Sequence, residues 1–148
     1  MKPSVRYGCE LWQTLAAVPS AVEEFCIEFR RHAEKHLDRP HRFAAELLVR
    51  EALNNAVVHG CRSDPGNRFR CALRLGVGRL TIAVIDDGDG FDWRAVLRRR
   101  NDNVATAATA ATAATTAASG RGLGILFRYA TRVRFNEKGN AVTVVKRF

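Results

Sequence analysis

Residues 46–60, Glu-Leu-Leu-Val-Arg-Glu-Ala-Leu-Asn-Asn-Ala-Val-Val-His-Gly, decide how the rest of the chain is interpreted. As a helix, this stretch carries Glu51, Asn55 and His59 four residues apart, so these polar side chains align along one face. Such groups are costly to bury without partners. The pattern alone is also that of a solvated helix face ending at Gly60. Apolar residues at three- and four-residue spacing indicate a buried stripe beside it: Phe43, Ala44, Leu47, Leu48, Ala52 and Ala56.

The composition indicates one compact domain over residues 1–148, because 47% of the residues are hydrophobic and the length is typical of a domain. No apolar run is long enough to cross a bilayer, and no signal-peptide segment follows Met1. We therefore expect a cytoplasmic protein without a membrane segment. The four cysteines show no metal-ligand spacing, so we interpret them as small apolar residues in a reducing compartment.

The net charge is +9, from 24 basic and 15 acidic residues. Such a balance fits a nucleic acid, an acidic protein partner or the phosphates of a nucleotide. No zinc finger, basic zipper or RNA-binding aromatic signature accompanies it, so we expect nucleic acid to be an unlikely partner. That minor alternative predicts binding that weakens steeply with salt.

The order of the expected elements is strand, two helices, two strands, helix, two strands. Ser20 is a candidate cap for the first helix, with Glu23 completing a capping box. Apolar residues alternate with arginines from Phe69 to Val77, which predicts a strand with one cationic face. The fold class is therefore α+β, a two-layer sandwich in which about three helices cover one face of a mostly antiparallel mixed sheet. The predicted ranges are 7–15, 19–37, 41–59, 69–77, 80–85, a helix opening at 120, 132–136 and 141–146.

The motif Asp86-x-Gly88-x-Gly90 follows a strand of branched apolar residues. Asp86 continues the alternation of Leu80, Ile82 and Val84, so its side chain should point inward. A buried carboxylate needs a hydrogen-bond donor, and the exocyclic amine of adenine is one. The glycines allow the backbone to approach a flat ring or a phosphate closely.

A second glycine cluster, Gly120-Arg121-Gly122-Leu123-Gly124, precedes an apolar helical pattern. Glycines that open a helix expose several backbone amides together, which favours binding of a polyphosphate. Arg121 could add a charge-assisted contact to the same anion.

The three segments together, Glu51-x-x-x-Asn55, Asp86-x-Gly88-x-Gly90 and Gly120-x-Gly122, resemble the N, G1 and G2 boxes of the Bergerat-fold (GHKL) ATPases, the superfamily of gyrase and the histidine kinases. The short chain and the string Glu-Ala-Leu-Asn-Asn-Ala-Val-Val-His-Gly resemble the anti-sigma-factor serine/threonine kinases of partner-switching systems. The likeness extends over nearly the whole chain.

This resemblance implies a role for each matching residue. Glu51 would be the general base, and Asn55 would help to hold a Mg²⁺ ion that bridges the phosphates of ATP. Asp86 would bind the adenine amine, with Gly88 and Gly90 lining the base pocket. Gly120, Gly122 and Gly124 would cradle the phosphates. We give His59 a structural role, as a cap or a hydrogen-bond partner of a site residue.

Two functions follow from the resemblance. The first is an ATP- and Mg²⁺-dependent serine/threonine kinase that phosphorylates a small anti-sigma-factor antagonist and also sequesters a sigma factor or a similar regulator. The second is a protein-binding module that uses the nucleotide as a conformational ligand without significant phosphoryl transfer. Relatives of this type often dimerise through the sheet, so a homodimer is also expected.

The segment that corresponds to the ATP lid, about residues 93–119, departs from the family pattern. From Asn103 to Gly120 it carries no charge, and threonines recur every third residue among alanines. A lid without anchoring charges favours the binding-module alternative, whereas Glu51 and Asn55 favour the kinase.

Overall fold

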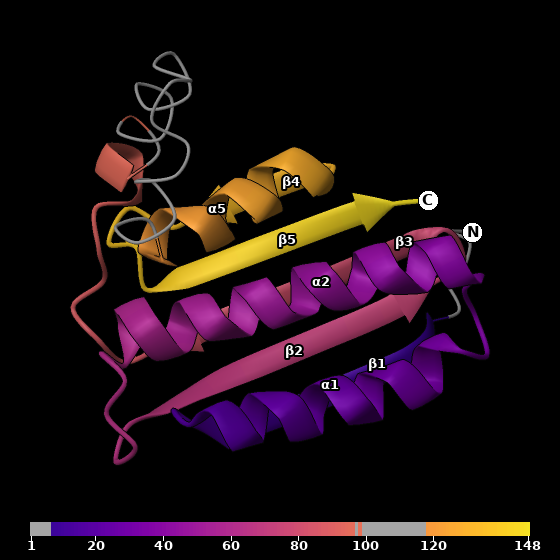
Figure 1. Ribbon diagram of the computed structural model, residues 1–148, viewed down its shortest axis with the longest axis horizontal. Coiled ribbons are helices and arrows are strands. Elements are labelled where there is room, and N and C mark those ends of the chain that lie inside the picture. Colours follow the sequence, from indigo (N-terminus) through magenta and orange to yellow (C-terminus); the bar gives the residue numbers. More distant parts are fainter. Residues whose placement is uncertain (1–6, 97, 99–117) are drawn as a thin grey trace, which may run out of the picture.

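The computed structural model describes residues 7–96, 98 and 118–148. Its five strands form one sheet in the order β1-β2-β3-β5-β4, and every described neighbouring pair is antiparallel. The labelled helices lie on one face of the sheet, so the domain has two layers (Figure 1). This arrangement confirms the expected α+β fold. The elements are β1 (Tyr7–Ala16), α1 (Pro19–Ala33), α2 (Arg39–Asn55), η1 (Ala56–Gly60), β2 (Arg68–Gly76), β3 (Arg79–Asp86), α5 (Ala118–Tyr129), β4 (Arg132–Phe135) and β5 (Ala141–Arg147).

The core lies between the helices and the inward-facing residues of the strands. In β2 the alternation is as predicted, with four buried side chains: Phe69, Cys71, Leu73 and Leu75. The prediction fails at Val77, which is 97% exposed because β2 ends at Gly76 and Val77 lies in the turn to β3. All four cysteines are free and buried, and burial raises the pKa of Cys26 to about 11 and of Cys71 to about 12. They are therefore unreactive core residues.

The buried stripe of α2 is rotated from the predicted one. The prediction that Phe43 belongs to the stripe was wrong, because its side chain is 74% exposed. At 3.6 residues per turn, Phe43 lies about 160° around the helix from Ala45. Leu47, four residues beyond Phe43, is only partly buried for the same reason. The buried residues repeat at three- and four-residue spacing: Ala45, Leu48, Val49, Ala52 and Leu53.

The end of the organising helix is a turn of π-helix, η1, in which the Cys61 N–H donates to the Ala56 carbonyl at 2.8 Å. Such wide turns inside helices are frequent at functional sites. Because the turn is wider than an α-helical one, the predicted alignment continues only from Glu51 to Asn55. His59 is displaced from their line and lies against the loop that follows β3.

Helix α1 begins at Pro19, as predicted, but its cap and its end differ from the prediction. Pro19 occupies a first-turn position, and the capping residue is Val18, which makes no side-chain cap. The predicted cap by Ser20 and the capping box with Glu23 were therefore wrong, because Ser20 already lies inside the first turn. The helix ends at Ala33 rather than near residue 37. Asp38 then caps α2 by accepting a hydrogen bond from the His41 N–H at 3.1 Å.

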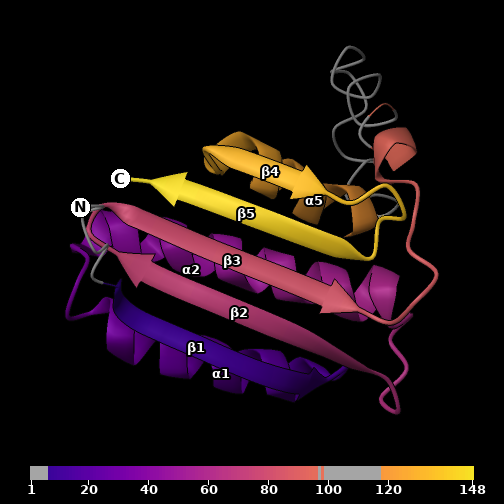
Figure 2. The same ribbon diagram turned by 180° about the vertical axis from the view of Figure 1, so that it is seen from behind.

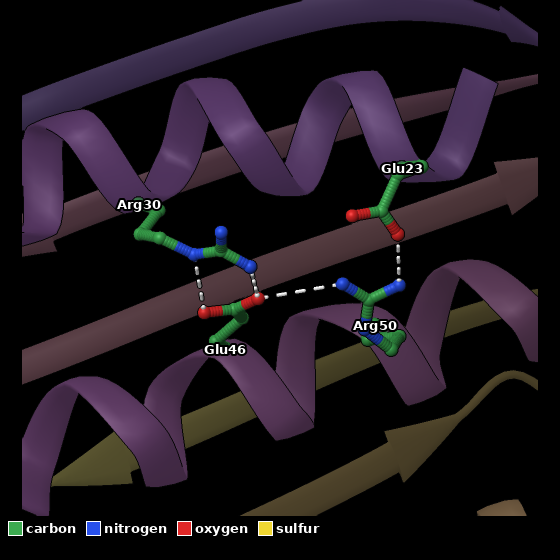
Figure 3. A network of polar contacts seen from close by, with 4 residues as sticks. All are labelled: Glu23, Arg30, Glu46 and Arg50. Atoms are coloured by element: carbon green, nitrogen blue, oxygen red, sulfur yellow. Dashed lines mark hydrogen bonds and ion pairs between the residues drawn. The ribbon is translucent and has the colours of Figure 1, made fainter. Parts of the chain in front are cut away.

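Four charged side chains join α1 to α2 on their solvent side (Figure 3). Arg50 donates to Glu23 at 2.6 Å and to Glu46 at 3.3 Å. Arg30 also binds Glu46, through Nε at 3.0 Å and Nη2 at 2.5 Å. The hydrogen bond from Arg30 is the largest cause that lowers the pKa of Glu46. This network fixes α2, the helix that carries Glu51 and Asn55, against its neighbour.

The opposite face of the sheet has no labelled helix in front of it (Figure 2). Among the described residues, the helices are too short or too polar to span a membrane.

Candidate functional site

Asp86, the last residue of β3, is anchored by its backbone on both sides. It pairs with Phe69 of β2, and its N–H donates to the Asn140 carbonyl at 3.0 Å. The side-chain amide of Asn140 donates back to the Asp86 carbonyl at 2.9 Å. The turn between β4 and β5 therefore fixes where the Asp86 side chain enters the domain. Asn140 was not predicted as a site residue, and its place in a Gly-Asn turn gave only a weak signal.

The Asp86 carboxylate is buried, as the alternation of β3 predicted, and its residue is 5% exposed. The Gly88 N–H donates to Oδ1 at 2.8 Å. Burial raises the pKa of the Asp86 carboxyl, whereas the Gly88 hydrogen bond lowers it; Asp87 and Lys138 make smaller opposing contributions. Titratable groups whose pKa is shifted by burial are found often at binding and catalytic sites.

Two glycines enclose this carboxylate. A Cβ atom at Gly60 would overlap the carboxylate of Asp86, and one at Gly88 would overlap the Gly60 carbonyl. Gly88 therefore lies where it was predicted, beside Asp86. Sequence reasoning missed Gly60 as a site residue, because the pair His59-Gly60 indicates only a helix end. Its place at the close of η1 brings α2 and β3 together.

Gly90 lies farther out and has a positive φ of +78°, which favours glycine. A Cβ atom at Gly90 would overlap the Lys138 carbonyl, and Gly139 packs in the same way against the backbone of Phe91. The loop after β3 and the β4–β5 turn thus pack backbone to backbone. Gly90 borders an open cleft of about 520 Å³, and Asp86 is not among the residues that line this cleft.

A small cavity of about 10 Å³ connects α2 to the end of β3. Asn55, Gly60, Asp86 and Phe91 are among its lining residues. It has room for about one water molecule. Phe91 lines both this cavity and the open cleft.

Aromatic rings hold Phe91 in that position. Its ring stacks on His59 with centroids 4.5 Å apart, and Phe135 meets it edge-on at 5.7 Å. Trp93 stacks in turn on Phe135 at 5.2 Å. His59 thus stacks on Phe91, and its predicted role as a cap or a hydrogen-bond partner stays a prediction. Phe91 and Trp93 were not predicted, and the only signal was the aromatic residue directly after Gly90.

Glu51 lies beside the second glycine cluster. Its Oε2 atom is 2.8 Å from the position that a Cβ atom would take at Gly122 of α5. Helix α5 packs against α2, and Gly124 is buried within it. The structure thus brings Glu51 and Gly122 together, one helical turn from Asn55 at the Asp86 cavity. Helix α5 begins at Ala118, so the glycines occupy its first two turns instead of preceding it.

The outer parts of the predicted site lie beyond the described residues. The structure describes the backbone of Gly120 and Arg121 within α5 but not the Arg121 side chain. The contact of Arg121 with phosphate therefore stays a prediction. Residues 93–96 of the predicted lid are helical, and residues 97 and 99–117 lie outside the described part of the chain.

The groups at the cavity fit an adenine nucleotide in chemical type. Asp86 offers an acceptor to an exocyclic amine, and Asn55 offers an amide oxygen of the kind that magnesium accepts. Magnesium usually completes its shell with substrate phosphates and water, so one protein oxygen is sufficient. A purine is larger than the cavity, so its binding requires the cavity to widen.

The model for the histidine kinase-like ATPase domain matches residues 13–146, from β1 to the end of β5. The chain belongs to the histidine kinase-like ATPase family. Its architecture and the order of its three motifs agree with this assignment, so the chain is an ATP-binding domain of the kinase-like ATPase type. No curated protein matches the chain closely enough to count as a relative.

Proposed function

We propose that this histidine kinase-like ATPase domain is a serine/threonine kinase that acts as an anti-sigma-factor-like regulator. It would phosphorylate a small protein antagonist with ATP and Mg²⁺. Phosphorylation of the antagonist would then control whether the domain holds the antagonist or a sigma factor or similar regulator.

The observation that carries this proposal is the position of Glu51. Its carboxylate lies against Gly122, at the start of the helix whose backbone amides are suited to phosphate. Asp86, the proposed adenine ligand, lines a cavity together with Asn55, one helical turn from Glu51. Under this proposal Glu51 is the general base, α5 cradles the phosphates and Asp86 of β3 binds the purine. Helix α2 carries both Glu51 and Asn55, so it would join the two ends of the nucleotide site. Phosphoryl transfer requires mainly such positioning and charge neutralisation.

In the proposed reaction Glu51 accepts the proton of a serine or threonine hydroxyl on the antagonist. The hydroxyl oxygen forms a bond to the γ-phosphorus as the bond from that phosphorus to ADP breaks. ADP leaves with the bridging oxygen and its electron pair. Asn55 would help to hold the magnesium ion, which neutralises phosphate charge. Asp86 would orient the adenine ring of ATP.

Thiophosphorylation tests this function and requires no identified antagonist. The purified domain is added with ATPγS and Mg²⁺ to a lysate of the source cells, and thiophosphorylated proteins are alkylated and detected by antibody. Glu51→Gln removes the base and should abolish labelling of a small protein. Glu24→Gln, an exposed change on α1, is the matched control and should label as the unmodified domain does.

Equal labelling with the unmodified domain and with Glu51→Gln would overturn the role of Glu51. No labelled protein in any reaction, although ATP still binds, would favour the alternative function, a nucleotide-dependent protein-binding module without phosphoryl transfer.

A further inference from the structure

The face of the sheet opposite the helices has no labelled helix in front of it (Figure 2). Residues directly opposite in antiparallel strands share a face, so the register gives its rows. One row runs from Trp12 through Ala72 and Ala83 to Thr143 and Arg134. Thr81 lies in the next row, between Arg74 and Val145, and Ile85 lies between Arg70 and Ala141. The middle of this face thus offers alanine, threonine and branched apolar surface.

Positive charge surrounds that centre. The outward positions of the described strands carry seven arginines and one acidic residue, Glu10, a balance of six positive charges. Arg70 is 62% exposed, and its contact with Asp87 is long, at 3.8 Å. The arginines are Arg68, Arg70, Arg74, Arg79, Arg132, Arg134 and Arg147.

Trp12 stands at one end of the central row as a fixed, exposed aromatic ring. It is 65% exposed, yet its Nε1 donates to Glu10 at 2.9 Å. Arg74 lies over the ring with its guanidinium carbon 5.8 Å from the centroid, and its Nε donates to Glu10 at 3.1 Å. Tryptophan and arginine are the residues most often found at the energetic centre of protein interfaces.

We propose that this open sheet face, defined by Trp12, Ala72, Ala83, Thr143 and the seven arginines around them, docks a partner protein whose surface presents carboxylates around an apolar side chain. Five strands about 4.8 Å apart and about 27 Å long give a footprint of roughly 650 Å². A standard interface takes about 800 Å² from each partner. The face is therefore somewhat smaller than one side of a standard interface, which fits a single, transient protein partner.

Charge excludes a second copy of this chain as the occupant. A dimer through this face would bring together two surfaces that each carry an excess of six positive charges, and like charges across an interface are unfavourable. A nucleic acid would satisfy the arginines but would leave the apolar centre facing a phosphate backbone, which is the least favourable partner for alanine and isoleucine. The expected dimer through the sheet is therefore not proposed for this chain.

The test uses labelled 12-residue peptides and fluorescence anisotropy, and it does not depend on ATP. One peptide alternates Glu with Val, a second alternates Glu with Ser, and a 20-base-pair duplex DNA is the third probe. The face variant is Arg68→Gln, Arg70→Gln and Arg134→Gln together. The matched control, Arg31→Gln, Lys35→Gln and Arg39→Gln, removes the same charge from exposed positions on the helical side. Trp12→Ala is measured separately, and circular dichroism confirms that each variant is folded.

The Glu/Val peptide should bind more tightly than the Glu/Ser peptide. The face variant and Trp12→Ala should each weaken binding of the Glu/Val peptide at least about tenfold, equivalent to about 1.4 kcal/mol. The control should bind this peptide as the unmodified protein does. Amide shifts in an NMR titration should centre on Ala72, Ala83 and Thr143.

Three outcomes would overturn the proposal. If the face variant and the control lose the same affinity for the Glu/Val peptide, the binding depends on the net charge of the protein and not on this face. Tighter binding of the duplex than of either peptide would indicate nucleic acid. A dimer in sedimentation that the face variant disrupts would indicate a second copy of the chain.

Discussion

Gly60 lies so close to Asp86 that a single methyl group at residue 60 would occupy the space of the carboxylate. Gly60 closes the π-turn after α2, and Asp86 ends β3, so the contact joins the two elements that build the cavity. The carboxylate is short, buried and held by the Gly88 N–H, which leaves it no room to withdraw. The absence of a side chain at residue 60 therefore determines where the proposed adenine acceptor points.

Gly60→Ala should reduce ATP affinity at least about tenfold, which corresponds to about 1.4 kcal/mol, because the new methyl group displaces the Asp86 carboxylate. Isothermal titration calorimetry measures the affinity, and circular dichroism checks that the sheet is intact. The matched control is Gly66→Ala, in the exposed turn before β2, which should bind as the unmodified protein does. A folded Gly60→Ala protein with unchanged affinity would show that Asp86 does not contact the nucleotide.

Asp86→Asn should bind ATP more weakly and yet make the domain more stable at pH 7. Burial raises the pKa of Asp86, so the ionised carboxylate lowers the free energy of unfolding of the domain. That cost is fully present above the raised folded pKa, and it is relieved as pH falls towards the unfolded value. The asparagine carries no such cost, and its Oδ1 can still accept from Gly88.

Thermal unfolding of both proteins between pH 4 and pH 8 measures this effect. The Tm of Asp86→Asn should exceed that of the unmodified protein at neutral pH, and the difference should shrink as pH falls. A variant that is less stable at neutral pH would show that the carboxylate is a structural ion and not a group kept for a ligand.

Phe91→Ala should speed the association of ATP by roughly tenfold. The Phe91 ring stacks on His59, and Phe91 lines the water-sized cavity beside Asp86, so we expect the ring to control entry to this cavity. If a nucleotide can bind only after this stack opens, the observed association rate is the intrinsic rate multiplied by the fraction of molecules in which the stack is open. Stopped-flow fluorescence with a labelled ATP analogue measures the rate, and Phe43→Ala, an exposed change on α2, is the control. An unchanged association rate would indicate that the base enters by another path.

Arg50→Met should lower stability by about 0.5–1 kcal/mol, because Arg50 bridges Glu23 and Glu46 between α1 and α2 (Figure 3). For a chain of this size that corresponds to about 1–4 °C in Tm. Arg30 and Arg50 lower the pKa of Glu46, so the network stabilises the fold above the ordinary carboxyl pKa and is lost as pH falls through the lowered one. The deficit should therefore disappear in strong acid. Arg39→Met, at an exposed position, should leave Tm unchanged.

Much of the fold could be predicted because alternation and helical period report directly on burial. Asp86 was placed inside the domain from the branched residues before it, and the structure agrees. The same reasoning failed at Phe43, because several apolar residues on α2 fit two neighbouring stripes and only packing against the sheet selects one. The prediction for Ser20 failed because Pro19 starts the helix two residues earlier than a cap at Ser20 requires.

The site was predicted by motif, and its closest contacts were not. Nothing in the order of residues reveals that Gly60 faces Asp86, because that contact depends on the π-turn and on how α2 crosses β3. Likewise, Phe91 reads as an ordinary aromatic residue after a glycine, and its stack on His59 arises only from the tertiary fold. Contacts between distant elements therefore carry the part of the site that local patterns do not encode.

The most direct test of the account is calorimetric titration of ATP into the purified domain, with Mg²⁺ and then with a chelator, for the unmodified protein, Asn55→Ala and Asn54→Ala. We predict binding that Mg²⁺ strengthens and that Asn55→Ala weakens about tenfold or more, whereas the neighbouring Asn54→Ala leaves it unchanged. Absence of binding in both buffers, or equal binding by all three proteins, would contradict an ATP site built on Asn55 and Asp86.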